Sequence, residues 1–276
     1  MGWAQSEQFL MRSLEERNMN KIEEYADLLD DAAHHAREVN QFDPEGRLSL
    51  QDAYAIQAAS IRRRVARGEL QVGVKMGFTS RAKMIQMGLS DVIWGRLTSG
   101  MQIEEGMSVD LSRYIHPRVE PEVAFVLKRS LGGQVTGPEA LAAVEAIAPA
   151  LEIIDSRYRD FKFSLPEVIA DNASSSGFVI GAWHSPSTDF DNLGLVLKID
   201  GRAVQVGSTA ALLGHPLRSL VAAARLAEEA GEPLQAGWIV MGGGATPAER
   251  MAPGKYISVE MEGLGCAGFH TQGSTI

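Results

Sequence analysis

The feature that most constrains the fold is a change in the pattern of apolar residues after Gly68. From there on the apolar segments are short and are separated by turn-forming pairs and by many of the chain's 28 glycines. Short apolar segments bounded by such residues are typical of strands. We therefore expect a strand-rich body, with strands at residues 73–76, 119–128, 150–155, 177–180, 194–199, 238–241 and 257–262. The pair Asp200-Gly201 predicts a tight hairpin after the fifth of these.

The first part of the chain has helical spacing instead. Apolar residues recur every three or four positions over residues 20–40, and a second helix is expected over residues 50–66, with Ser49 and Asp52 as its capping pair. Two interior helices are expected at residues 138–147 and 216–230. The pattern predicts an α+β protein with an N-terminal helical region, residues 1–70, and a strand-rich domain, residues 71–276.

Charge and cysteine content exclude several classes of partner. The net charge is −9 and no block of lysine and arginine with interleaved aromatic residues appears, so nucleic acid is not an expected partner. No run approaches the roughly 18 apolar residues of a membrane helix, so no membrane partner is expected either. Cys266 is the single cysteine and the first fourteen residues lack a secretory pattern, which together favour a cytoplasmic location.

Two glutamates stand on the most informative segment, which runs from His116 to Lys128. In a strand Glu120 and Glu122 point to the same face, where two carboxylates repel unless a cation or a proton relieves them. Pro121 cannot donate to a sheet ladder, which favours an edge or a bulge there. The alternative is that both glutamates face water on an amphipathic strand.

A third carboxylate favours the cation. Glu152 lies within an apolar strand, where a charged side chain needs a partner, whereas Asp155 falls on the opposite face and suits a turn or a cap. Three oxygen ligands without a cysteine or histidine cluster are typical of Mg²⁺ or Mn²⁺ rather than zinc.

Other polar residues near apolar segments are candidates for chemistry. Lys75 is a charge within an apolar strand, and near a bound oxyanion its amine could stabilise negative charge or carry a proton. The alternative for Lys75 is a side chain that extends to the surface. Residues 170–177 offer small polar groups that could bind a carboxylate, or could form an ordinary loop.

These segments together resemble the hydratase/decarboxylase branch of the fumarylacetoacetate hydrolase superfamily, over roughly residues 50–270. The matching motifs occur in the family's order: Gly73-Val-Lys75-Met-Gly-Phe-Thr-Ser80, Pro117-Arg-Val-Glu120-Pro-Glu122, Leu151-Glu152-Ile-Ile-Asp-Ser-Arg157, Ala170-Asp-Asn-Ala-Ser174, Leu213-Gly-His-Pro-Leu217 and Gly263-Leu-Gly265.

The resemblance implies a fold and a set of site residues. It implies the family's strand-rich mixed β fold, with residues 71–276 as the catalytic domain, and assembly into homo-oligomers. It also implies that Glu120, Glu122 and Glu152 hold Mg²⁺ or Mn²⁺, that Lys75 is catalytic, and that Ser174 contacts the substrate.

The branch contains two close activities of aromatic meta-cleavage degradation. One is hydration of 2-hydroxypenta-2,4-dienoate, and the other is decarboxylation of 2-oxo-3-hexenedioate, a 2-oxo dicarboxylic acid. The segments 80–88 and 154–163 resemble the decarboxylases, and Ile93 stands where hydratases of the branch carry an acidic residue. The loop after Met241 departs from the family by lacking its usual threonine, which leaves substrate preference there open.

We therefore expect the decarboxylase, with Arg157, Arg159 or Lys162 holding the distal carboxylate of the substrate. The first alternative is the hydratase. The second is a non-catalytic partner subunit in a complex with a related hydratase, and the third is a metal-stabilised structural protein. The presence of the three glutamates and Lys75 argues against the non-catalytic partner.

Overall fold

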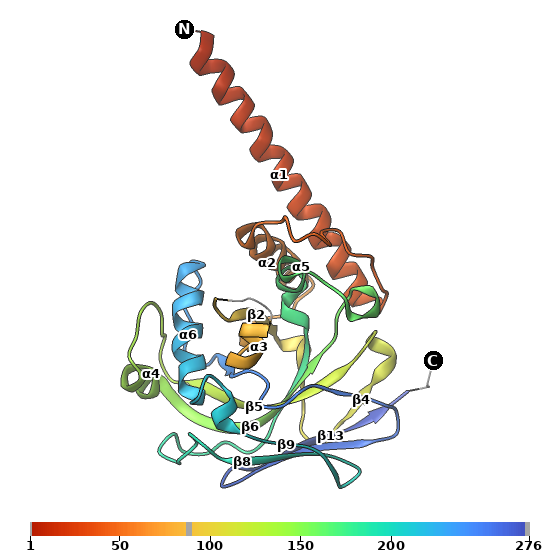
Figure 1. The fold of residues 1–276 in the computed structure, drawn as a ribbon, viewed down its shortest axis with the longest axis vertical. Helices are drawn as coiled ribbons and strands as arrows, with labels where there is room; N and C mark the ends of the chain where they lie inside the picture. Colours follow the sequence, from red (N-terminus) through yellow and green to blue (C-terminus); the bar gives the residue numbers. More distant parts are fainter. Residues whose placement is uncertain (1, 87–89, 274–276) are drawn as a thin grey trace.

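The structure is a computed structural model that describes residues 2–86 and 90–273. Part of the predicted motif at residues 80–88 and the last three residues of the predicted domain therefore lie outside the described residues. Two stacked sheets form the body, and a long helix, α1, projects from it (Figure 1). In the described residues, no helix is long and apolar enough to cross a lipid bilayer.

The larger sheet carries the candidate site. Within the described residues it has eight strands. Its order is β2 (Ile93–Thr98), β1 (Gln71–Gly77), β10 (Ile239–Met241), β5 (Arg118–Leu127), β6 (Val144–Ile154), β7 (Ser175–Ile180) and β3 (Gln102–Ile103), with β11 (Glu249–Arg250) also paired to β5.

The smaller sheet has five strands in the described part of the chain. It runs in the order β4 (Ser108–Asp110), β13 (Gly265–Gln272), β12 (Tyr256–Met261), β8 (Gly194–Ile199) and β9 (Arg202–Ser208). The β8–β9 hairpin turns at Asp200 and Gly201, which both have positive φ, so the predicted hairpin is confirmed.

The main core lies between the two sheets. Val123, Phe125 and Leu127 of β5 point into it and meet Leu197 and Phe269 of the smaller sheet. Alternation along β5 therefore turns Glu120 and Glu122 to the opposite face of the larger sheet, as the sequence predicts.

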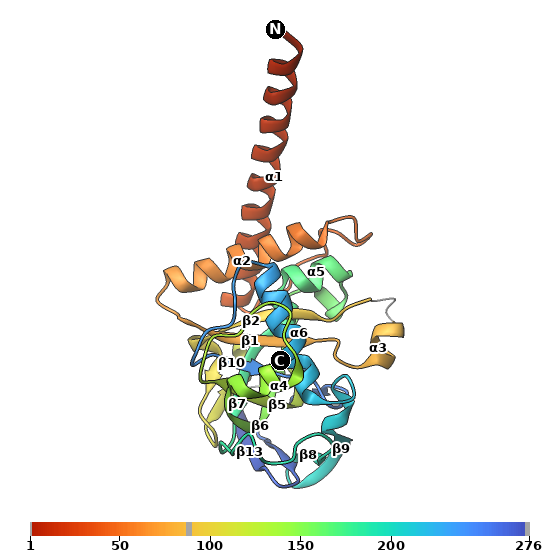
Figure 2. The same cartoon turned by 90° about the vertical axis from the view of Figure 1, so that its left-hand side faces the viewer.

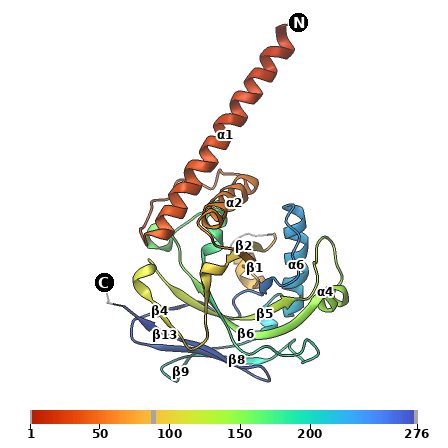
Figure 3. The ribbon, with the colours of Figure 1, turned by 180° about the vertical axis from the view of Figure 1, so that it is seen from behind.

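That opposite face is covered by the two N-terminal helices and by a short helix from the middle of the chain. The helices α2 (Leu50–Ala66) and α5 (Leu165–Ala170) lie above the sheet, and the C-terminal part of α1 (Gly2–His34) packs beside them (Figures 2 and 3). Ala26, Ile56 and Ile169 meet in a second apolar cluster there. The predicted bounds of α2 are confirmed, with Ser49 accepting the Asp52 backbone N–H as its N-cap.

Two helices differ from the predictions in their bounds. The first begins at Gly2, well before residue 20, and ends at His34, before residue 40, and Ala36 then adopts positive φ. The third predicted helix shrinks to α4 (Gly137–Ala143), because Val144 to Ile147 pair with Leu127 to Phe125 and belong to β6. Backbone hydrogen bonds to the neighbouring strand make that segment a strand, and the local helix propensity of its residues cannot predict this pairing. The remaining longer helix, α6 (Pro216–Glu229), matches its predicted start at Pro216.

Candidate metal and substrate site

Three glutamates meet on one face of the larger sheet. Glu120 of β5 lies directly opposite Glu152 of β6, and Glu122 follows two residues along the same face. One carboxylate oxygen from each lies within 4.8 Å of the others, and Glu122 and Glu152 are fully buried. Antiparallel register thus brings together side chains about thirty residues apart in sequence.

The cluster has the electrostatics of a cation site. Burial raises the pKa of Glu122 well above its usual value, and repulsion from Glu152 adds to this. One oxygen of Glu122, Oε2, accepts the Gly243 backbone N–H at 2.8 Å, while Oε1 is buried without a hydrogen-bond partner among the described residues. Buried carboxylates this close repel unless a cation joins them, and all-oxygen ligands suit a hard divalent ion. The residues therefore fit Mg²⁺ or Mn²⁺.

Lys75 supplies a fixed positive charge beside the carboxylates. Its Nζ on β1 lies 3.0 Å from Oε2 of Glu152 and donates to the Ala173 carbonyl at 2.9 Å. Burial lowers the pKa of Lys75, but the three carboxylates outweigh it, so the net pKa is raised. The side chain is therefore an ammonium ion at neutral pH, suited to stabilising negative charge or donating a proton rather than to acting as a base.

A left-handed turn presents Ser174 to the site. Asn172, Ala173 and Ser174 all have positive φ, which is unusual for three consecutive residues other than glycine. The Asn172 side chain holds the turn by bonding both the N–H and the carbonyl of Arg96. Ser174 Oγ is buried and has no hydrogen-bond partner in the described part of the chain. Strain of this kind concentrates at functional sites, and the free hydroxyl suits a substrate oxygen.

The glycine loop after β10 closes the other side. A Cβ on Gly244 would lie 2.7 Å from the Glu120 carboxylate, so any side chain there would displace that carboxylate.

The position of Pro121 differs from the prediction of a sheet edge or a bulge, because β5 is a central strand of the sheet. The proline is tolerated because it faces the gap between β10 and β11, where its carbonyl accepts the Ala245 N–H.

These groups surround a cavity of about 330 Å³. Charged and polar side chains on its wall include Lys75, Arg118, Glu120 and Ser174. The apolar part of the wall is contributed by separate elements: Phe78, Ile93, Ile154, Phe161, Phe163, Val168, Pro247 and Ala248. The cavity is large enough for a small acid and combines charged groups with apolar side chains.

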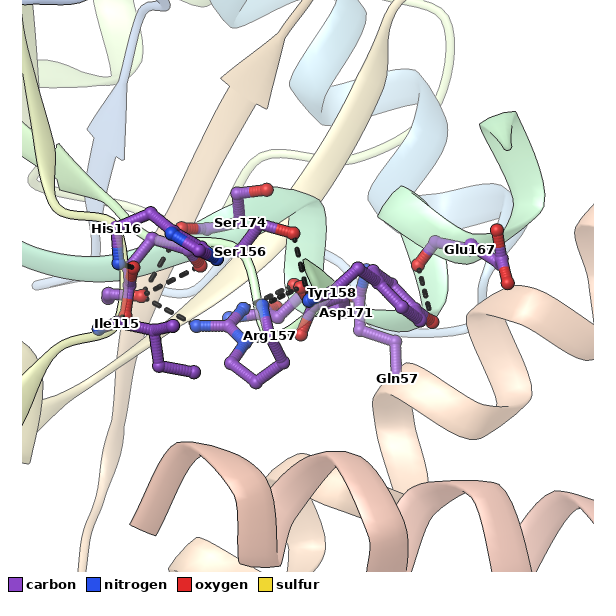
Figure 4. A network of polar contacts seen from close by, with 12 residues as sticks. Gln57, Ile115, His116, Ser156, Arg157, Tyr158, Glu167, Asp171 and Ser174 are labelled. Carbon is purple, nitrogen blue, oxygen red and sulfur yellow. Dashed lines mark hydrogen bonds and ion pairs between the residues drawn. The ribbon is translucent and has the colours of Figure 1, made fainter. Parts of the chain in front are cut away.

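The structure does not bring the predicted distal-carboxylate residues to this cavity. Arg157 is buried elsewhere, where it pairs with Asp171 and donates to Ser176 Oγ at 2.7 Å (Figure 4). Arg159 and Lys162 are largely exposed, and Arg159 contacts Glu38 at 3.3 Å. Asp155, as predicted, serves a turn by accepting the backbone N–H groups of Ile115 and His116.

Arg157 is expected to contribute stability instead. Burial raises the pKa of Asp171 to about 6, although Arg157 lowers it, so the arginine offsets a buried acid. Replacing Arg157 with methionine leaves the Asp171 carboxyl group buried without its charged partner. Breaking such a buried pair costs about 3–5 kcal/mol of unfolding free energy. Urea denaturation measures the loss, and Arg159→Gln, which alters a surface pair, should cost less than about 1 kcal/mol. Equal effects of the two variants would contradict this structural role.

Arg118 is a cavity residue that the sequence analysis does not predict. It lies two residues before Glu120, so the alternation that aligns Glu120 with Glu122 also places Arg118 on their face. That alternation is the sequence signal that identifies Arg118.

Comparisons with known proteins show which proteins this chain is similar to. The chain is 57% identical over 253 residues to a 4-oxalocrotonate decarboxylase of a Pseudomonas species, covering 92% of this chain and 99% of that protein. It is 37% identical over 221 residues to a 2-keto-4-pentenoate hydratase of Paraburkholderia xenovorans, covering 79% and 82%. The structure of 4-oxalocrotonate decarboxylase from Pseudomonas putida G7, complexed with magnesium and adipate, superposes with a TM-score of 0.89 at 38% identity, covering 92% of this chain and 98% of that one.

The match to the family itself covers most of the chain. The profile described as fumarylacetoacetate (FAA) hydrolase C-terminal matches residues 32–270, which include the larger sheet, nearly all of the smaller sheet and every group of the candidate site. The predicted α+β fold with its N-terminal helical region is confirmed, and the chain belongs to the fumarylacetoacetate hydrolase family.

Proposed function

We propose that this protein is a divalent-metal-dependent decarboxylase that converts 2-oxo-3-hexenedioate, or 4-oxalocrotonate, to 2-hydroxypenta-2,4-dienoate and CO₂. The observation that carries the proposal is the meeting of Glu120, Glu122 and Glu152 beside the buried ammonium of Lys75, at a cavity that also has apolar side chains in its wall. The relatives named 4-oxalocrotonate decarboxylase support the same reaction.

The reaction moves one electron pair along the substrate. The carbon–carbon bond to the distal carboxylate breaks, that group leaves as CO₂, and its electrons pass through the conjugated double bond onto the 2-keto oxygen. A bound Mg²⁺ or Mn²⁺ ion, held by the three glutamates, would supply Lewis-acid stabilisation of the negative charge at that oxygen.

The chain's own residues bind the substrate and stabilise the negative charge that develops on its keto oxygen. Lys75 places a second positive charge near the keto oxygen and can deliver the proton that completes the product. Ser174 Oγ, which is buried and has no partner among the described residues, would donate to the proximal carboxylate. The apolar wall, including Phe163 and Val168, excludes water from the departing group.

The composition of the cavity wall favours decarboxylation over hydration. Ile93, the position at which the sequence resemblance separates the two activities, lines the cavity and is 5% exposed. Adding water requires a group that can move a proton to or from it, and an isoleucine cannot do so. The hydratase relatives make that activity the alternative function for this site.

The test of this function is metal-dependent CO₂ release. With 2-oxo-3-hexenedioate and Mg²⁺ we expect loss of substrate absorbance together with CO₂, and EDTA should abolish both because the charge on the keto oxygen then lacks its stabilising cation. Mg²⁺ should also raise the melting temperature, because it binds the folded chain alone. Water addition to 2-hydroxypenta-2,4-dienoate without CO₂ release would instead identify the hydratase.

The assembly and location of the protein remain part of the proposal. We propose a cytoplasmic homo-oligomer, which can also form a complex with a related hydratase that consumes its product. Hydratases are among the relatives of this chain, and product transfer within such a complex would limit its loss to solution. Mass measurement in solution, alone and with such a hydratase, tests both assemblies.

A further inference from the structure

Arg118 is a basic side chain in the cavity wall that the mechanism above does not use. It lies on β5, two residues before Glu120, and lines the same cavity. Its Nε atom is buried and, among the described residues, has no hydrogen-bond partner. A guanidinium nitrogen buried without a partner is costly, which indicates that a ligand atom completes its contacts.

The neighbouring residues hold this guanidinium in place. Its central carbon lies 4.4 Å from the ring centre of Phe161, in a cation–π contact. Phe161 and Asp160 both have positive φ of 58°, a strained backbone for residues with a Cβ, and the turn brings the aromatic ring to the cavity wall. On the neighbouring strand Arg250 is registered directly opposite Arg118, so two positive charges share this part of the sheet. An anion there would relieve their repulsion.

We propose that Arg118 binds the distal carboxylate of the substrate and makes the site select dicarboxylic 2-oxo acids over monocarboxylic ones. This inference rests on the proposed function. The spacing fits, because residues two apart on a strand are separated by about 7 Å, comparable to the length of an extended six-carbon acid. A molecule with its 2-oxo acid end at the three glutamates therefore reaches Arg118 with its other end.

The chemistry of the contact suits both recognition and reaction. A guanidinium can donate two parallel hydrogen bonds to a carboxylate, which fixes the plane of that group. Phe161 occupies one face of the guanidinium and leaves its edge for the ligand. Fixing the departing carboxylate orients the bond that breaks relative to the conjugated system, so Arg118 is a specificity-determining residue that also positions the substrate.

The experiment compares two saturated acids on the Mg²⁺-loaded protein. Adipate, with two carboxylates, and hexanoate, with one, are titrated calorimetrically into the wild type, Arg118→Gln, Arg118→Lys and the surface control Arg129→Gln. We expect Arg118→Gln to weaken adipate binding by about tenfold to a hundredfold while hexanoate binding stays unchanged, the loss typical of one charge-assisted contact. Arg118→Lys should keep part of the preference because it keeps the charge, and Arg129→Gln should keep all of it.

Kinetics and metal binding separate this inference from the proposed function. The KM for 2-oxo-3-hexenedioate should rise in Arg118→Gln by a similar factor, with Mg²⁺ affinity retained. An unchanged adipate preference in Arg118→Gln, or its loss in Arg159→Gln instead, would overturn the assignment of Arg118. If the preference for adipate depends on Arg118 but the wild type releases no CO₂, the role of Arg118 in binding the distal carboxylate would stand and the proposed decarboxylase activity would be wrong.

Discussion

Replacing Glu122 with glutamine is expected to lower turnover by several orders of magnitude and to weaken Mg²⁺ binding sharply. Glutamine has nearly the same shape, and its amide oxygen can still accept the Gly243 N–H that Glu122 Oε2 accepts at 2.8 Å. Its NH₂ group then occupies the place of Oε1, the buried oxygen without a partner among the described residues. An NH₂ group cannot bind a cation, so the Lewis-acid contribution of several kcal/mol is lost.

The same change should stabilise the protein when no metal is present. Removing one of three mutually repelling carboxylates relieves the repulsion that, with burial, raises the pKa of Glu122. Thermal unfolding with EDTA should therefore give a higher melting temperature than the wild type, whereas the rise on adding Mg²⁺ should disappear. Glu145→Gln, at an exposed position of the same strand as Glu152, is the matched control and should change neither quantity. Wild-type Mg²⁺ affinity and turnover in Glu122→Gln would remove Glu122 from the ligand set.

Replacing Lys75 with methionine is expected to reduce turnover by about a hundredfold to ten-thousandfold, the range for losing a positioned proton donor. Methionine fills most of the space of the buried lysine but leaves Glu152 and the Ala173 carbonyl without their ammonium partner. Because the charge of Lys75 repels a cation at the glutamates, Mg²⁺ affinity should hold or increase. Turnover and metal affinity therefore separate in this variant, whereas they fall together in Glu122→Gln.

The stability effect of this variant has the opposite sign to that of Glu122→Gln. Without Lys75 the three carboxylates lose their neutralising charge, so the metal-free protein should melt at a lower temperature and gain more from Mg²⁺. Lys255→Met is the control, since its ammonium pairs with Asp200 at the surface. Full turnover in Lys75→Met under saturating metal and substrate would show that the ammonium takes no part in the reaction.

The sequence predicted the parts of the fold that depend on local pattern. Alternation along residues 119–128 placed Glu120 and Glu122 on one face and the apolar side chains on the other, and the structure has this arrangement. The capping pair of Ser49 and Asp52 gave the start of its helix, and Asp200-Gly201 gave its hairpin. These features depend only on residues a few positions away in the sequence, so the sequence alone can predict them.

Predictions were wrong where pairing with a distant strand overrides local preference. Val144 continues a helical pattern, yet pairing with Leu127 makes it part of a strand. The strand Gly265–Gln272 has little apolar pattern and was not predicted, because its partners β12 and β4 supply the hydrogen bonds that define it. Pro121 was expected at a sheet edge or a bulge, but it lies in regular register on a central strand, opposite a gap that another loop fills.

For the site, the sequence by itself determined the residue types and which of them share a strand face. It placed a pair of carboxylates on one strand, a third on another and a lysine on a further one, and the resemblance assigned them to one family. Only the tertiary structure decided that Glu120 registers against Glu152, that Lys75 reaches Glu152, and that Arg118 rather than Arg157 faces the cavity. The physical reason is that strand register and the strained turns at Asn172–Ser174 and Phe161 are set by packing among segments far apart in sequence, which no local pattern encodes.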